Sequence, residues 1–210
     1  MAAWDSGDTT GMRGLASLLD LSYVDTPDDR TYHLEVGALP EIGLLADNAH
    51  SVSDLMYGRY RGCNLQAFDL TLPTYADDPS APERSCALVT FVAGFPHLEL
   101  TSHTPMSRMR ISRQRDWLDF VPDGFRDRFD VATDDNETAR ALLSDEMVNW
   151  LAEGRDDVRV ELSGGSLLGH VPQLGPDDHE AWESLIDYIV DFHAHIPEQA
   201  WIDYNTFWLT

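Results

Sequence analysis

Histidine is the first residue type to test for chemistry, because imidazole is a common zinc ligand and the chain has eight histidines. His193 and His195 are two residues apart, so on a helix their side chains point about 200° apart and do not share one ion. His179 and Glu183 have the four-residue spacing that suits a shared ion, but a solvated acidic helix start explains them more simply. Since a metal site needs three or four converging ligands, the spacing predicts no metal and no cofactor.

Cysteine is the second candidate. Cys63 and Cys86 are isolated and form no C-x-x-C pair, and both lie in strand-like runs where a small apolar residue is the commoner role. A cysteine enzyme requires a histidine that the fold brings close, which the sequence does not reveal. The nucleophile elbow G-x-S-x-G, the P-loop and G-x-G-x-x-G are all missing. The sequence therefore predicts no catalytic residue, and it leaves open whether the two cysteines meet.

A cluster of arginines is the first candidate binding feature. Four of the 14 basic residues fall within eight positions, at Arg108, Arg110, Arg113 and Arg115. The favoured interpretation is pairing with neighbouring acids of the same chain, such as Asp119. The alternative is a docking patch for an acidic partner or an anionic lipid surface.

An aromatic tail is the second candidate. Trp201, Tyr204, Phe207 and Trp208 recur at helix-like spacing in the last ten residues. Exposing all four would create a large apolar patch, which soluble proteins rarely show without a use. We expect the tail to fold back onto its own domain; the alternative is self-association or contact with a protein partner.

Composition limits the classes of partner and the compartment. The 210 residues include 37 acidic and 14 basic side chains, giving a formal charge of −23, so a nucleic-acid backbone is repelled. All the basic residues are arginine. No secretory signal opens the chain, and no run reaches the roughly 18 apolar residues that a membrane span needs. These features predict a soluble cytoplasmic protein and disfavour membrane association.

Strand patterns fill the middle of the chain. A helix is predicted over Gly14–Val24, with Leu15, Leu18 and Leu19 on one face. Whether Tyr23 joins this face is left open. Strands are predicted in "YRGCNLQAFDLTL", in "SCALVTFVAGF", in "HLELTS" after Pro96, and in "FRDRFDVAT".

The second half alternates helix, hairpin and helix. "DDNETARALLSDEMVNWLAEG" predicts a helical region that restarts near Ser144. In "DVRVELSGGSLLGHVP", Gly164 and Gly165 predict a two-residue turn between two strands, with Val160 on the buried side. "GPDDHEAWESLIDYIVDFHAHIP" predicts an amphipathic helix that ends at Pro197. Its apolar stripe comprises Trp182, Leu185, Ile186 and Ile189, with His193 left open.

These elements predict one α+β domain over residues 1–210, with a polar segment at 1–13 and the aromatic tail at 198–210. The sheet is expected to be mostly antiparallel with helices packed on one face, in the order α-β-β-β-β-α-β-β-α. Together, "GRYRG…AFD", "ARALLSDEMVNWL", "VRVELSGGSLL" and the helix ending in "IP" resemble an actinobacterial family of unknown function. Many of its members carry transmembrane segments ahead of a soluble domain. The resemblance covers Leu15 to Pro197 and implies a fold but no activity.

The chain departs from that family by lacking a membrane segment and by ending in "EQAWIDYNTFWLT". The arginines of "GRYRG" are expected on the solvated face of a strand. The function predicted is a non-catalytic interaction or regulatory module. The alternative is a small-molecule-binding protein or an enzyme whose site is built from residues distant in the sequence.

Overall fold

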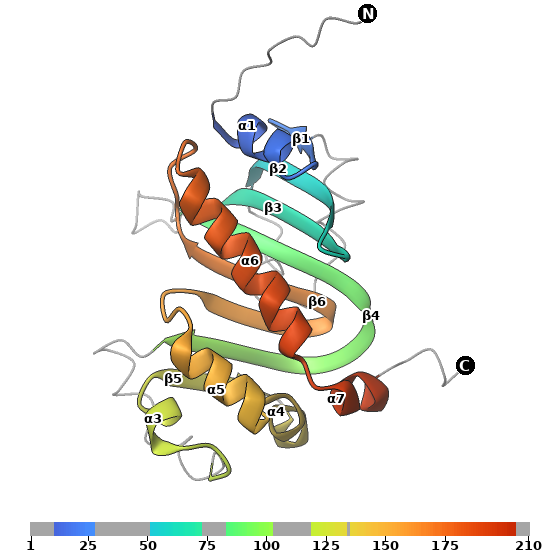
Figure 1. The fold of residues 1–210 in the computed structure, drawn as a ribbon, viewed down its shortest axis with the longest axis vertical. Coiled ribbons are helices and arrows are strands. Elements are labelled where there is room, and N and C mark those ends of the chain that lie inside the picture. The colour runs from blue at the N-terminus through green and yellow to red at the C-terminus, as the bar shows by residue number, and fades with distance from the viewer. Residues whose placement is uncertain (1–10, 28–50, 73–82, 103–118, 134, 205–210) are drawn as a thin grey trace, which may run out of the picture.

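The computed structural model describes residues 11–27, 51–72, 83–102, 119–133 and 135–204 (Figure 1). One six-stranded sheet runs through the described part, and each strand pairing in it is antiparallel. The strands are β1 (Ser22–Val24), β2 (Ser51–Tyr60), β3 (Cys63–Thr71), β4 (Glu83–Ser102), β5 (Phe129–Thr133) and β6 (Arg159–Pro172). The helices are α1 (Gly11–Leu18), α3 (Asp123–Arg126), α4 (Asn136–Leu142), α5 (Asp145–Glu153), α6 (His179–His195) and α7 (Glu198–Asp203).

The predicted α+β class is confirmed. All the helices bury side chains in one apolar cluster on one face of the sheet, including Leu15 of α1, Phe125 of α3 and Trp182 of α6. The longest helix, α6, lies diagonally across this face (Figure 1). All four residues of its predicted stripe are fully buried: Trp182, Leu185, Ile186 and Ile189. A smaller cluster contains buried residues of β2, β3, β4 and β6.

The first helix differs from its prediction. It spans Gly11–Leu18 and ends before Asp20, whose positive φ of 56° is incompatible with further helix. Tyr23 belongs to β1, where it pairs with Met56, and Leu18 is 74% exposed. The prediction that Leu15 is buried is confirmed, but the predicted helix is too long at its C-terminal end.

The segment "GRYRG" is the end of one strand and a turn. Arg61 and Gly62 have φ values of 48° and 89°, and the flanking residues Tyr60 and Cys63 pair with each other. Two central residues with positive φ are the signature of the tightest hairpin turns, usually written Asn-Gly or Asp-Gly. Arg59 and Arg61 are both exposed, as predicted; Arg59 lies on β2, whereas Arg61 lies in the turn rather than on a strand, because the turn begins directly after Tyr60.

Strand β4 replaces the two strands predicted on either side of Pro96. It turns back on itself, so that its two arms enclose β6 (Figure 1). The first arm pairs with β6 from Arg84↔Pro172 to Thr90↔Ser166, and the second from Phe95↔Gly164 to Leu100↔Val160. Because the two arms of β4 point in opposite directions, β6 also doubles back.

The turn of β6 lies where the sequence predicts it. Gly164 has a φ of 53°, and a Cβ on Gly165 would lie 2.4 Å from the carbonyl oxygen of Phe91. Only glycine fits such a close approach of two backbones. Val160 is buried at 1% exposure, as the predicted hairpin requires.

The predicted break in the helical region is also confirmed. Ser144 separates α4 from α5, and its hydroxyl accepts a hydrogen bond from the backbone N–H of Met147. Asp135 caps α4 in the same way, accepting from the N–H groups of Glu137 and Thr138. These caps satisfy helix donors that would otherwise lack partners.

Candidate functional site

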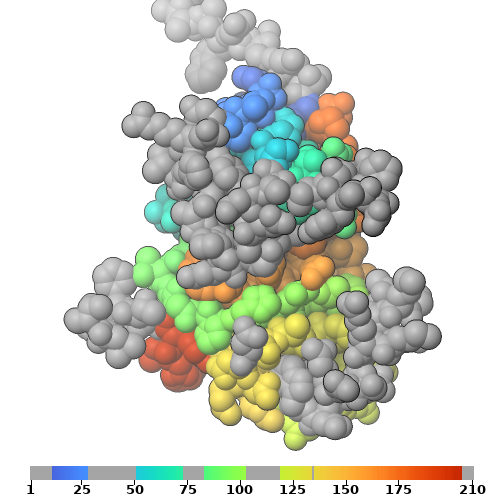
Figure 2. Space-filling view, turned by 180° about the vertical axis from the view of Figure 1, so that it is seen from behind, coloured from blue at the N-terminus to red at the C-terminus, as the bar shows by residue number. Residues whose placement is uncertain are grey.

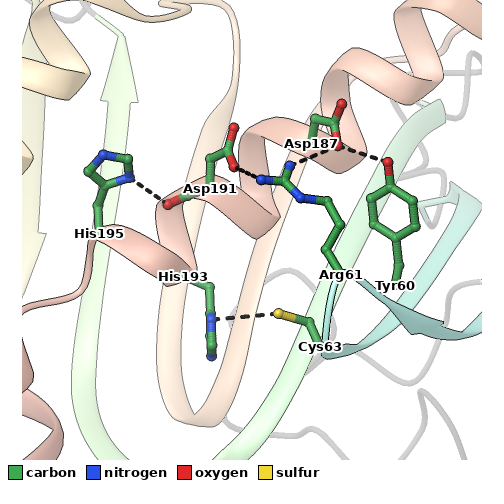
Figure 3. A network of polar contacts seen from close by, with 7 residues as sticks. All are labelled: Tyr60, Arg61, Cys63, Asp187, Asp191, His193 and His195. Carbon is green, nitrogen blue, oxygen red and sulfur yellow. Dashed lines mark hydrogen bonds and ion pairs between the residues drawn. The ribbon is translucent and has the colours of Figure 1, made fainter.

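The tip of the β2–β3 hairpin contacts the outer face of α6 through a polar network (Figure 3). The Arg61 guanidinium donates to Asp187 at 3.1 Å and to Asp191 at 2.7 Å, one helical turn apart. The Tyr60 hydroxyl donates to the same Asp187 at 3.0 Å, and burial together with this carboxylate raises the pKa of Tyr60 to about 12. Since all three charged side chains are well exposed, the ion pairs add little stability and serve mainly to fix the hairpin on the helix.

A cysteine and a histidine meet beneath this network. The Sγ atom of Cys63, the first residue after the turn, lies 3.6 Å from Nδ1 of His193 on α6 (Figure 3). Their separation of 130 positions in the chain explains why no local sequence pattern indicates the contact. This is the arrangement of a nucleophile beside a base, so its protonation decides what it can do.

The electrostatics of this pair favour neutral groups. Burial raises the pKa of the Cys63 thiol, against the opposing effect of Arg61 and Arg59. Burial also lowers the pKa of His193. A reactive thiolate–imidazolium pair needs both shifts reversed. The nearby carboxylate of Asp191 does not favour protonation of His193, because it is paired with Arg61. The contact is a thiol–imidazole packing contact of low nucleophilicity.

An aromatic cluster lies next to His193. Its ring is 5.4 Å from Phe91, in the bend of β4, and 5.1 Å from Trp201 of α7. Trp201 meets Phe91 edge-on at 4.9 Å and Phe95 at 5.2 Å. Edge-to-face contacts of this kind stabilise beyond the apolar area that they bury.

Tyr204 ties the end of α7 to the sheet. Its carbonyl oxygen accepts from the backbone N–H of Gly94 at 2.9 Å, and its hydroxyl lies 2.8 Å from that of Thr138. Ala200 is fully buried in the core. For residues 198–204, the expected folding back of the tail is therefore observed, although they cover the bend of β4 rather than a sheet face.

Two large apolar side chains are left exposed where β4 meets α7. Val92 is 64% exposed and Ile202 is 62% exposed. From behind, α7 lies next to β4 (Figure 2). We use the name apolar corner for Phe91 and Val92 in the bend of β4 together with Trp201, Ile202 and Tyr204 at α7, two segments that are joined by the ring contact between Phe91 and Trp201. The sequence analysis missed Val92, since nothing in the run "LVTFVAGF" distinguishes its one exposed valine.

The predicted binding residues divide into two groups. Trp201 and Tyr204 belong to the apolar corner, where both are half-buried. The others lie outside the described residues: Arg108, Arg110, Arg113, Arg115, Phe207 and Trp208. Asp119, considered as a partner for those arginines, bonds to Arg140 at 2.9 Å.

The remaining histidine and cysteine candidates make contacts that hold elements of the fold together. His179 Nε2 lies 2.9 Å from the carbonyl oxygen of Gly11 and so links α6 to α1. Cys63 and Cys86 are both free thiols, and Cys86 is buried opposite Phe68 of β3. In the ranges that the structure describes, no three His, Cys, Asp or Glu side chains converge as metal ligands.

Comparisons with known proteins give a fold relationship. No family model matches the chain, and no curated sequence matches it significantly. Of the helices described, none combines the length and apolar character that crossing a bilayer requires. The crystal structure of the mycobacterial trehalose monomycolate transport factor A, TtfA, superposes with a TM-score of 0.60 at 13% identity. The match covers 89% of this chain and 94% of that one. The chain therefore has the fold of an actinobacterial protein with which it shares little sequence.

Proposed function

We propose that the protein is a non-catalytic interaction or regulatory module that binds a protein partner through the apolar corner. The observation that carries the proposal is the exposure of Val92 and Ile202 on two elements held rigidly together. Exposed apolar side chains that cluster mark interaction sites more often than isolated ones do. The hydrogen bonds of Tyr204 fix the end of α7 against β4 and α4 before any partner arrives, so little ordering entropy is lost on binding.

The fold relationship supports an accessory role. TtfA is described as a transport factor, and at 13% identity only its fold is carried over to this chain. Membership of the actinobacterial family and a role beside a transport system are parts of our proposal. We also propose a cytoplasmic location, which fits two free thiols in the described residues.

A cysteine-dependent activity is the second candidate, and the 3.6 Å contact between Cys63 and His193 favours it. The neutral state of both groups weighs against it, because the thiol lacks the thiolate character that nucleophilic catalysis uses. A thermal-shift screen of metals, nucleotides and common metabolites separates the two candidates. A ligand that stabilises the wild-type protein but not the Cys63→Ala variant would show a binding site at this thiol and favour the second candidate.

The first candidate is tested by measuring which proteins the immobilised protein retains from an extract of the cells that make it. Wild-type protein and the double variant Val92→Ser/Ile202→Ser are immobilised in parallel, with Leu18→Ser as the control. Leu18 is also strongly exposed but lies on α1, away from the corner. We expect a protein retained by the wild type and the control and lost from the double variant. Equal retention by all three would show that the corner has no part in binding.

A further inference from the structure

Cys63 and His193 bring two metal-binding atoms together. The Sγ atom of Cys63 lies 3.6 Å from Nδ1 of His193. Zinc in proteins has a metal–sulfur distance of about 2.3 Å and a metal–nitrogen distance of about 2.0 Å. With bonds of these lengths, a separation of 3.6 Å between the two ligand atoms corresponds to an angle of about 110° at the metal. The two atoms therefore already have the separation of neighbouring ligands on one three- or four-coordinate ion.

Contacts on both sides hold the two donors in place. The ring of His193 packs against Phe91 and Trp201, at 5.4 Å and 5.1 Å between ring centroids. Cys63 is the first residue of β3 and pairs with Tyr60 across the tight turn. Both donor residues are half-buried, so an ion reaches them from solution, and little side-chain ordering is needed to hold it.

The surroundings of the pair select the kind of ion. The carboxylates of Asp187 and Asp191 bond to Arg61 and not to the pair, so the donors on offer are one sulfur and one nitrogen (Figure 3). Such donors favour Cu(I) and zinc over magnesium and calcium, which prefer oxygen ligands. Burial lowers the pKa of His193, which keeps its imidazole neutral at pH 7 and able to coordinate a metal.

The number of ligands decides between the two remaining ions. In the part of the chain that the structure describes, no three His, Cys, Asp or Glu side chains converge, so the pair supplies the protein ligands alone. Zinc sites normally use three or four protein ligands. Cu(I) is softer, prefers thiolate, and is stable with three ligands, of which one can come from solution.

We propose that Cys63 and His193 form a binding site for a single Cu(I) ion. On binding, the S–H bond breaks and its proton goes to the solvent, while the sulfur and the lone pair of Nδ1 each form a bond to copper. The copper stays Cu(I) throughout, so no oxidant or reductant is consumed. This inference goes beyond the binding module proposed above, needs no partner at the apolar corner, and gives the thiol the role of a ligand rather than a nucleophile.

The test is an anaerobic titration of the reduced full-length protein with Cu(I), in competition with the coloured chelator bathocuproine disulfonate. The site variants are Cys63→Ser and His193→Gln. The matched controls are Cys86→Ala, which removes the other thiol in the chain, and His195→Gln. His195 lies two residues further along α6, where its ring stacks on Trp150 at 4.7 Å. Circular dichroism and thermal melting verify that each variant is folded.

We expect the wild type and both controls to bind one equivalent of Cu(I) with affinities within twofold of each other. Each site variant should bind at least tenfold more weakly. A pH indicator in weakly buffered solution should report one proton released per ion bound. In the Cys86→Ala protein, which keeps the site intact, one equivalent of Cu(I) should also block alkylation of Cys63 by iodoacetamide.

Unchanged affinity in either site variant would overturn the inference, and loss in Cys63→Ser alone would show a thiol adduct without the histidine. Displacement of the bound Cu(I) by one equivalent of zinc would overturn the choice of ion. The capture experiment above uses variants that keep Cys63 and His193, so the failure of either proposal is seen separately from the other.

Discussion

At the scale of single residues, the degree of burial decides what each ionisable side chain can do. Cys63 and His193 have the separation of a catalytic pair, yet burial shifts both pKa values toward the neutral forms. Asp69 shows the same effect on a carboxyl group. Burial is the main cause that raises its pKa to about 6, with Asp54 and Glu83 adding to the rise and the Ser85 hydroxyl opposing it.

The thiol of Cys63 should react slowly. In a Cys86→Ala background, we expect alkylation by iodoacetamide to reach half its maximal rate above the ordinary thiol pKa of about 8.5, because burial disfavours the thiolate. The rate is measured by mass spectrometry between pH 6 and 10, with the unfolded protein as the reference. Faster alkylation of the folded protein at pH 6 to 7 would indicate an activated thiolate and favour an enzyme.

The Asp69 carboxyl group should make stability fall as the pH rises from about 4 to about 6. Its pKa is raised in the folded state, so between these values the folded protein holds more protons than the unfolded one, and deprotonation costs stability. Asp69→Asn removes this dependence, and we expect it to increase the free energy of unfolding at pH 7 by about 1–2 kcal/mol, after allowance for solvent screening. Urea denaturation across this range measures the difference. A variant with the same pH dependence as the wild type would assign the effect to another group.

At the scale of elements, a close approach between an α6 side chain and the β6 backbone determines how these two elements pack. Gly169 of β6 lies under α6, and a Cβ at this position would be 2.1 Å from Cδ1 of Ile189. Ile189 is fully buried, so it has little room to move. The glycine thus allows the helix to approach the sheet closely enough to bury its stripe.

Gly169→Ala should destabilise the protein by about 1–3 kcal/mol through overpacking. In an Ile189→Ala background the same change should cost much less, because the methyl group then fills space that isoleucine left. A double-mutant cycle by chemical denaturation gives this coupling. Gly124→Ala is the matched control, since a Cβ there has no neighbour within 4 Å. Additive effects of the two changes would contradict the packing that we describe.

The sequence predicts elements well where a local pattern determines them. The stripe of α6, the restart at Ser144 and the turn at Gly164 all follow from spacing, capping or glycine chemistry. The turn at Arg61 was missed because its first residue does not favour positive φ. The bend of β4 and the contact between Cys63 and His193 depend on residues far apart in the chain, so no local pattern indicates them.

At the scale of the whole molecule, α7 and Tyr204 contribute to the core of this acidic protein. The ring contacts of Trp201 and Tyr204 with Phe95 join this segment to β4, and the hydrogen bond between the Tyr204 and Thr138 hydroxyl groups joins it to α4. The end of the chain is therefore part of the folded unit up to residue 204.

Deleting residues 198–210 should lower the free energy of unfolding by about 2–4 kcal/mol, because it uncovers Phe91 and Phe95 and removes the buried Ala200. We expect the truncated protein to remain folded but to aggregate more readily. Light scattering after size exclusion and thermal melting measure both effects. Conversion of a dimer into an equally stable monomer would instead identify the tail as an interface between copies.

The enclosure of β6 between the two arms of β4 has a consequence for the order in which the protein folds. Arg84 pairs with Pro172, which is 172 − 84 = 88 residues later in the chain. During synthesis, β1, β2, β3, both arms of β4 and β5 all emerge before β6. The strand that pairs with both arms of β4 is therefore made last. Long-range pairing of this kind slows folding, so the ribosome must release most of the chain before the sheet can close.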